Sequence, residues 1–114
     1  MLADFLVGGL TNAAVVCGSP TSSLVGSIDP WGHVAVPFPA VAIRIEVYPF
    51  PTVAGGNVAV RDQDFNTVAS LTFTGAQSLT LNDIEVPAGT VLYYYVNEAV
   101  GLSEVSINLV LRSL

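Results

Sequence analysis

The sequence contains no lysine, and its only basic residues are Arg44, Arg61 and Arg112. Nine Asp and Glu residues oppose these three cations and give a formal net charge of −6 at pH 7. Proteins that bind nucleic acid draw much of their affinity from clustered Lys and Arg, and anionic membranes attract the same residues. We therefore expect neither nucleic acid nor a membrane as a partner. The acidic balance is interpreted as a solubility feature, with a specific cationic partner as the alternative.

Long apolar runs are also missing. A membrane-spanning helix needs about 18 or more consecutive apolar residues, whereas Gly, Pro, Ser, Thr or a charged residue interrupts every candidate run here. The apolar stretch at residues 2–10 follows no basic residue, and Asp4 stands where a secretory signal would carry Lys or Arg. The sequence therefore predicts neither a membrane span nor a cleaved signal.

Cysteine and histidine occur once each, as Cys17 and His33. One cysteine cannot form an internal disulfide, and these two residues cannot supply a zinc site. Cys17 is expected to be a small buried hydrophobic residue, with an interchain bridge or a reactive thiol as alternatives. His33 lies near Asp29 and several serines, but no G-x-S-x-G motif accompanies it. The sequence therefore predicts no enzyme activity and no cofactor.

Apolar surface is what the chain has in excess. Charged residues make up 11% of the chain against a usual value of about 25%, while apolar residues make up 52% and mean hydropathy is +0.64. A length of 114 residues fits one core, so residues 1–114 are predicted to form a single domain. Because obligate interfaces resemble a core cut in half, we expect an oligomer or a component of a larger assembly.

Strand-like alternation runs through most of the chain. In residues 41–48 and 105–111, apolar and other side chains alternate with the period of two that a half-buried strand requires. Further strands are expected at residues 57–61, 68–73, 78–81 and 90–96, with short ones near residues 23–26 and 33–36. Turn signals separate them at residues 49–51, 55–56, 62–66, 75–76, 82–83, 87–89 and 101.

This spacing predicts an all-β fold, an antiparallel two-sheet sandwich of about eight strands with a jelly-roll or immunoglobulin-like arrangement. No ten-residue stretch shows a helical pattern. Residues 1–40 are expected to form an N-terminal arm and a proline-containing, loop-rich segment that contacts neighbouring chains.

The segment RDQDFNT places Asp62, Asp64 and Asn66 at the alternating spacing of calcium ligands. An EF-hand loop would also need Gly at its sixth position and Glu at its twelfth, where Thr67 and Phe73 stand. Asp and Asn are equally favoured in turns, where they hydrogen-bond to nearby backbone. A hairpin loop is therefore the preferred interpretation, and a metal site is the alternative.

Aromatic residues supply the candidate interaction sites. Tyr93, Tyr94 and Tyr95 are consecutive, so at least one must face outward from a strand. An exposed tyrosine together with Trp31 could stack on a sugar ring or serve a protein interface, and we favour the interface. Phe38 and Phe50 each lie between two prolines and could cap the core, the preferred interpretation, or anchor a neighbouring chain. The residues predicted at an interface are Phe5, Leu6, Trp31, Phe38, Phe50 and Tyr94.

Three features of the whole chain occur together: the absence of lysine, the apolar N-terminal segment MLADFLVGGLTNAAVVCGSP, and the closing block VPAGTVLYYYVNEAVGLSEVSINLVLRSL. In this pattern the chain resembles the small β-sandwich decoration, or cement, proteins of tailed bacteriophage capsids. The resemblance implies a homotrimer, or less often a dimer, on the outer capsid surface of the virion. There it would clamp adjacent copies of the major capsid protein. The alternatives are a receptor- or carbohydrate-binding domain of a phage tail fibre and a subunit of a non-viral β-sandwich assembly.

Overall fold

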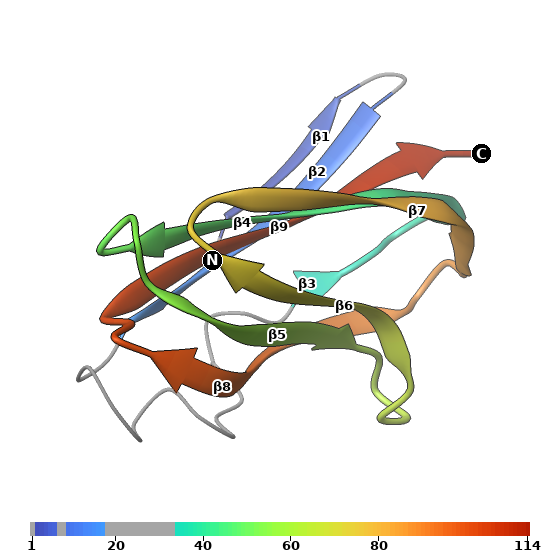
Figure 1. The fold of residues 1–114 in the computed structure, drawn as a ribbon. Coiled ribbons are helices and arrows are strands. Elements are labelled where there is room, and N and C mark those ends of the chain that lie inside the picture. Colours follow the sequence, from blue (N-terminus) through green and yellow to red (C-terminus); the bar gives the residue numbers. More distant parts are fainter. Residues whose placement is uncertain (1, 7–8, 18–33) are drawn as a thin grey trace.

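The computed structural model describes the backbone of residues 2–6, 9–17 and 34–114 and the side chains of residues 35–114. This part of the chain contains nine β-strands and no helix (Figure 1). The strands are β1 (Leu2–Leu6), β2 (Gly9–Cys17), β3 (Val34–Ala35), β4 (Ala40–Phe50), β5 (Gly55–Arg61), β6 (Thr67–Thr74), β7 (Gln77–Val86), β8 (Val91–Val100) and β9 (Glu104–Ser113).

The strands form two antiparallel sheets that face each other (Figure 1). The five-stranded sheet has the order β1-β2-β9-β4-β7, and the four-stranded sheet has the order β3-β8-β5-β6. Every strand pair is antiparallel. The predicted all-β, two-sheet sandwich is therefore confirmed. None of the described segments is a helix of the length and apolarity needed to cross a membrane.

The core lies between the sheets and is built from alternate residues of the central strands. In β9, Ile107 and Leu109 are fully buried, whereas Asn108 and Val110, which alternate with them, are only partly buried. The predicted alternation is confirmed for residues 105–111 and for residues 45–48. It is wrong at residues 41–43, where Val41 and Ala42 are both buried, Ile43 is only partly buried, and the pairing shifts register between Ala42 and Arg44. The largest fully buried side chains are Tyr94, Ile45, Leu92, Leu102, Ile107, Leu109, Leu111, Val36, Val47 and Val58.

One predicted turn, at Gly55 and Gly56, is wrong, because both residues lie in β5. A Cβ on Gly55 would lie 2.9 Å from the carbonyl oxygen of Phe73, and one on Gly56 would collide with the carbonyl oxygen of Glu98. These glycines therefore allow neighbouring backbones to approach closely, and the chain turns earlier, over residues 51–54.

A second predicted turn, at Asn82 and Asp83, is also wrong, because both residues lie within β7. Asp83 has a φ of 45°, and the pairing of β7 with β4 shifts register opposite this point. The two residues therefore form a bulge. β7 is an edge strand, and a bulge is one of the devices that discourage further strand pairing at an edge.

The described part of residues 1–40 belongs largely to the five-stranded sheet. β2 pairs with β9 from Leu10 to Cys17, and β1 pairs with β2 as a hairpin that rises away from the four-stranded sheet in Figure 1. The short strand expected near residues 33–36 is present as β3. The strand expected near residues 23–26 lies outside the described residues, and contact of this segment with neighbouring chains stays a prediction.

Candidate functional site

The residues predicted at an interface are dispersed in the structure. Phe5 and Leu6 lie in β1, at backbone positions opposite Leu10 and Gly9 of β2, and Trp31 lies outside the described residues. Phe38 is partly buried against the core, which confirms the core-cap interpretation for this residue. The same interpretation is wrong for Phe50, whose side chain is 62% exposed.

Tyr94 corrects the prediction made for the tyrosine run. It is fully buried in the core, so it cannot present itself to a partner. Strand alternation in β8 sends Leu92, Tyr94 and Val96 inward and turns Tyr93 and Tyr95 toward the outer face of the sheet. There Tyr93 is partly exposed, whereas Tyr95 is buried against Arg61 and Phe65. The expectation that one tyrosine of the run faces outward holds, but the residue chosen was wrong by one position.

The Tyr94 hydroxyl has no hydrogen-bond partner among the described residues, and burial raises its pKa well above the usual value. Because an unpaired buried hydroxyl is costly, Tyr94→Phe is expected to raise the free energy of unfolding by about 1 kcal/mol at pH 7. In the wild type the unfolded chain loses this proton first, from a pKa of about 10, so stability falls as pH rises above that value. Urea titrations at pH 7 and above pH 10 check both effects.

The matched control for Tyr94→Phe is Tyr48→Phe. Tyr48 is half exposed, so water can reach its side chain and its hydroxyl carries no burial cost. This variant is expected to keep the wild-type stability at pH 7 and the wild-type loss of stability in alkali. Equal alkaline losses in the wild type and in Tyr94→Phe would contradict the assignment of that loss to Tyr94.

One end of the sandwich, where β4 and β8 end, carries exposed apolar side chains. Phe50, Val53 and Val100 are 62%, 82% and 61% exposed. Val53 and Val100 line a shallow pocket of about 240 Å³ that also includes Gly56 and Glu98. We call Phe50, Val53 and Val100 the β4-end patch.

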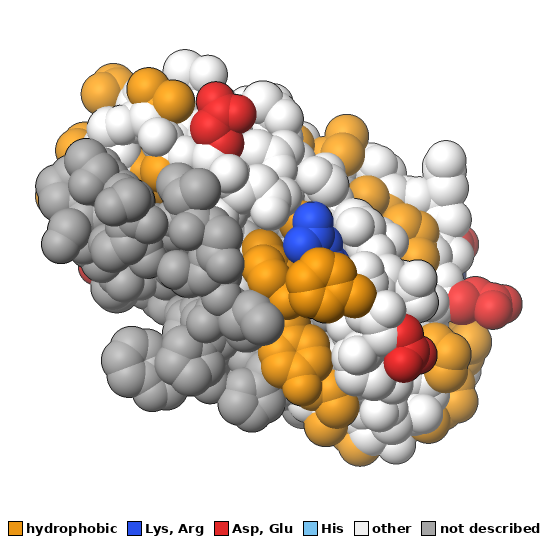
Figure 2. Space-filling model, turned by 90° about the horizontal axis from the view of Figure 1, so that it is seen from below, with side chains coloured by type: hydrophobic (Ala, Val, Ile, Leu, Met, Phe, Trp, Pro, Cys, Tyr) orange, Lys and Arg blue, Asp and Glu red, His pale blue; other side chains and the backbone are white. Residues whose placement is uncertain are grey.

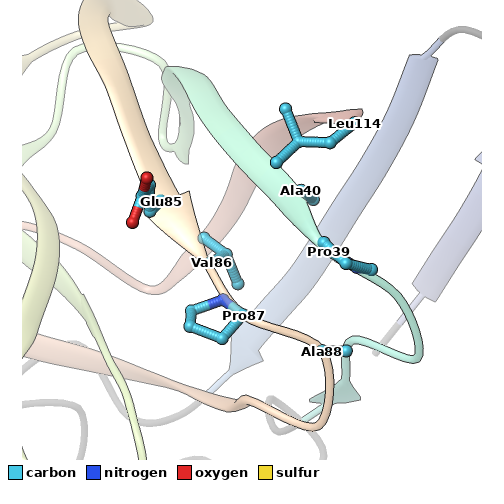
Figure 3. A pocket seen from close by; sticks show the side chains of 7 residues that line it. All are labelled: Pro39, Ala40, Glu85, Val86, Pro87, Ala88 and Leu114. Atoms are coloured by element: carbon cyan, nitrogen blue, oxygen red, sulfur yellow. The ribbon is translucent and has the colours of Figure 1, made fainter.

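The other end carries a second apolar hollow of about 260 Å³, lined mainly by Pro39, Val86, Pro87, Ala88 and Leu114 (Figure 3). Its sides come from the start of β4, the end of β7 and the C-terminal residue, and a backbone hydrogen bond from Leu114 N–H to the Pro39 carbonyl (3.1 Å) joins two of them. Leu114 is 76% exposed at its rim. We call this hollow the C-terminal pocket.

The tip of the β5–β6 hairpin carries a third feature, an aromatic cluster around one arginine. The Arg61 guanidinium carbon lies 5.1 Å from the ring centre of Phe65 and 4.7 Å from that of Tyr95. The two rings meet edge to face, with centres 5.5 Å apart. Figure 2, which views the molecule from below, shows hydrophobic side chains gathered around the one basic side chain visible on this face.

The backbone of this tip is fixed by Asp62. Its Oδ1 accepts hydrogen bonds from the N–H groups of Asp64 and Asn66, both at 2.9 Å, and its carbonyl accepts one from Phe65 N–H at 3.0 Å. The predicted hairpin loop at residues 62–66 is confirmed. No group of three or more potential metal-ligating side chains occurs in the described part of the chain.

Phe65 occupies an unusual backbone position. Its φ is 68°, in the left-handed region that glycine and asparagine favour, and the same conformation costs an ordinary residue about 1 kcal/mol. Its ring is nonetheless 62% exposed. Phe65, Asp62, Gln63, Tyr93 and Tyr95 line a pocket of about 220 Å³, which we call the hairpin-tip pocket.

The three arginines differ in their partners. Arg44 forms an ion pair with Glu46 (2.8 Å), and Arg112 forms one with Asp83 (3.2 Å). Arg61 makes no ion pair with any carboxylate of the described residues, and its guanidinium is held by aromatic rings instead. No sequence motif marks this cluster, apart from a phenylalanine among the polar residues of a turn.

Comparison with known proteins gives similarity of structure but no match of sequence. No protein-family model and no curated protein sequence matches the chain. A chain in the acidic stable capsid structure of Helicobacter pylori bacteriophage KHP30 is 12% identical, with a TM-score of 0.57 over 99% of this chain and 92% of that chain. The fold resembles that of a phage capsid chain. At this identity the similarity concerns the fold alone.

Two more distant similarities have TM-scores below 0.5 and inform neither the fold nor the function. A GH26-CBM35 β-(1,4)-mannanase of Podospora anserina is 9% identical, with a TM-score of 0.41 over 88% of this chain and 27% of that chain. A virus-like particle of extra small virus, from the prawn Macrobrachium rosenbergii, is 10% identical, with a TM-score of 0.33 over 95% of this chain and 80% of that chain.

Proposed function

We propose that this protein is a non-catalytic structural protein of a phage virion, which binds the outer surface of the assembled capsid and bridges adjacent major capsid proteins. The observation that carries the proposal is the similarity to a chain of the KHP30 capsid structure, because it extends over nearly the whole of both chains. A match of that extent involves the complete domain rather than one part of a larger enzyme.

The distribution of exposed apolar side chains supports bridging. β4 begins at Ala40 beside the C-terminal pocket and ends at Phe50 in the β4-end patch. An eleven-residue strand spans roughly 33 Å, so the two apolar features lie at opposite ends of the sandwich. In Figure 1 the C-terminus and the β4–β5 turn accordingly lie at opposite sides of the molecule. A molecule with one apolar contact at each end can join two neighbouring subunits.

The mechanism follows from mass action. A protein that binds the assembled shell and not its separated subunits lowers the free energy of the shell, as any ligand specific for one state does. The contribution grows with occupancy of the sites. Self-association into a homotrimer would multiply the contacts that each complex makes with the shell.

The test uses heads assembled without this chain, prepared from the phage whose genome encodes it. Wild-type protein is expected to sediment with these heads and to raise the temperature at which they dissociate. The double variant Phe50→Ser/Val53→Ser and the single variant Leu114→Ser each remove one apolar end. Each is expected to bind more weakly and to lose most of the gain in dissociation temperature, because bridging requires both ends.

Leu79→Ser is the matched control, because Leu79 is a 43% exposed leucine of β7 that pairs with Ile45 in the middle of β4, away from both ends. It is expected to act like the wild type. The proposal is refuted if wild-type protein neither sediments with the heads nor changes their dissociation temperature. Analytical ultracentrifugation of the isolated protein tests the homotrimer.

A further inference from the structure

The hairpin-tip pocket shares no lining residue with either apolar end and holds groups that the bridging proposal does not use. Its apolar walls are the rings of Phe65, Tyr93 and Tyr95, and its polar groups come from Asp62 and Gln63. Gln63 is oriented by a hydrogen bond that its Oε1 accepts from the Val91 N–H of β8 (3.0 Å). Its side-chain amide NH₂ has no hydrogen-bond partner among the described residues, so it can donate to a ligand.

Phe65 is the residue that folding explains least. The turn would be served better by Gly or Asn at a φ of 68°, and a large apolar ring gains little by remaining mostly in water. A residue that contradicts both its local backbone and the hydrophobic effect is expected at functional sites rather than structural ones. The exposed ring is therefore available to bury a ligand.

The charges around the pocket favour a neutral ligand. Arg61 brings one positive charge to the rings, and Asp62 brings one negative charge to the pocket wall. The carboxylate of Asp62 already accepts hydrogen bonds from the N–H groups of Asp64 and Asn66. Arg61 packs against the rings and is not among the residues that line the pocket, so the lining offers no cation to an anionic ligand. The one carboxylate of the lining, Asp62, is already engaged by backbone N–H groups, which leaves little attraction for a cation.

From this combination we propose that the hairpin-tip pocket binds a neutral pyranose ring of a glycan. A pyranose has an apolar C–H face and a rim of hydroxyl groups. The C–H face would stack on Phe65. The sugar hydroxyls would accept hydrogen bonds from the Gln63 amide and donate hydrogen bonds to carboxylate or hydroxyl oxygens at the rim. The volume of about 220 Å³ is below the roughly 300–1,000 Å³ of pockets that enclose whole drug-sized ligands, so one ring enters and the rest of the glycan stays outside.

A protein partner fits the same surface less well. Interface anchors lie inside a ring of contacts that excludes water. Here the aromatic cluster is bordered by polar residues of the turn, the partly buried Asp62 and the exposed Asp64. A large protein surface closing over the tip would have to desolvate Asp64 as well, whereas a small sugar leaves Asp64 in water and can donate hydroxyl hydrogen bonds to Asp62 in the pocket lining.

The experiment measures glycan binding by the isolated full-length protein. The fluorescently labelled wild type is applied to a glycan array that contains neutral bacterial and mammalian oligosaccharides. Saturation-transfer NMR with the bound oligosaccharides then identifies the protons that touch the protein. We expect binding to glycans with a shared neutral pyranose, and saturation strongest on the protons of one C–H face.

Two substitutions at Phe65 separate binding from folding. Phe65→Asn places a residue suited to the left-handed backbone, so its melting temperature is expected to equal or exceed that of the wild type, while affinity for the glycan falls at least tenfold. Phe65→Tyr keeps the ring and is expected to keep the affinity. Phe50→Ser removes an exposed phenylalanine at the other end of the molecule and is expected to leave glycan binding unchanged.

Several results would overturn the proposal. They are the absence of binding to every neutral glycan on the array, an affinity that Phe65→Asn leaves intact, or a Phe65-dependent cross-link to a capsid protein without glycan binding, which would identify a protein contact. Because the isolated chain is used, the outcome is independent of whether the protein binds capsids.

Discussion

Replacing Gly56 by Ala is expected to destabilise the protein by about 3 kcal/mol, the upper range for forcing an extra methyl group into a filled space. The added Cβ would collide with the carbonyl oxygen of Glu98 on β8 and come within 3.3 Å of the Ala99 Cα. Both are backbone atoms, so no side-chain rotation can relieve the clash. β5 and β8 must separate, and these two strands form the centre of the four-stranded sheet. Urea denaturation of the purified variant measures the effect.

Gly89→Ala is the matched control for Gly56→Ala. Gly89 has a φ of 85°, so alanine is strained there, but a Cβ would have no atom within 4 Å. Its expected cost of about 1 kcal/mol therefore reports the backbone strain without the collision. Equal losses for the two variants would contradict the close approach of β5 and β8 at Gly56.

The strands were predictable from sequence where the two faces of a strand differ in polarity. In residues 44–48 and 105–111 one face is apolar and the other carries residues such as Arg, Glu, Ser or Asn, so the alternation identifies both the strand and its buried side. At Ile43 a register shift between Ala42 and Arg44 breaks this pattern, and the local sequence does not reveal it. β8 offers no such contrast. Both of its faces consist of Val, Leu and Tyr around the tyrosine run, and only packing against the other sheet decides that Tyr94 is inside.

The wrong turns have a related physical cause. Gly-Gly and Asn-Asp pairs mark places where the backbone departs from regular geometry, but a departure can be a reversal, a close approach or a bulge. At Gly55 and Gly56 it is a close approach to the backbones of the flanking strands β6 and β8, and at Asn82 and Asp83 it is a bulge opposite β4. Local sequence does not distinguish these cases, because the neighbouring strand supplies the constraint.

The candidate sites were the least predictable features. The β4-end patch, the C-terminal pocket and the hairpin-tip pocket each combine residues from strands far apart in the chain. Phe50 stands out in the sequence as an aromatic residue between prolines, and its contact with a partner stays a prediction, whereas Val53, Val100 and Leu114 carry no motif. At the hairpin tip, the left-handed backbone position is occupied by Phe65, a residue type that gives no sequence signal for such a position.

Truncation of a single core leucine is also expected to lower the free energy of unfolding strongly. Leu109 is fully buried at the centre of β9, which is itself the central strand of the five-stranded sheet. Leu109→Ala removes buried methyl groups and leaves a cavity, at an expected cost of about 2–5 kcal/mol. For a domain of this size, each kcal/mol lowers the melting temperature by about 4 °C. Differential scanning calorimetry and urea denaturation measure the loss.

The neighbouring substitution Val110→Ala makes the prediction specific to one face of β9. Val110 is only partly buried, on the face directed away from the core, so its truncation is expected to cost less than about 1 kcal/mol. A large difference between adjacent positions would follow directly from the alternation of side chains along a strand. Similar losses at the two positions would mean that the outer face of the five-stranded sheet is also buried, for example against another copy of the chain in solution. Measuring both variants over a range of protein concentrations distinguishes that case, because stability gained from self-association rises with concentration.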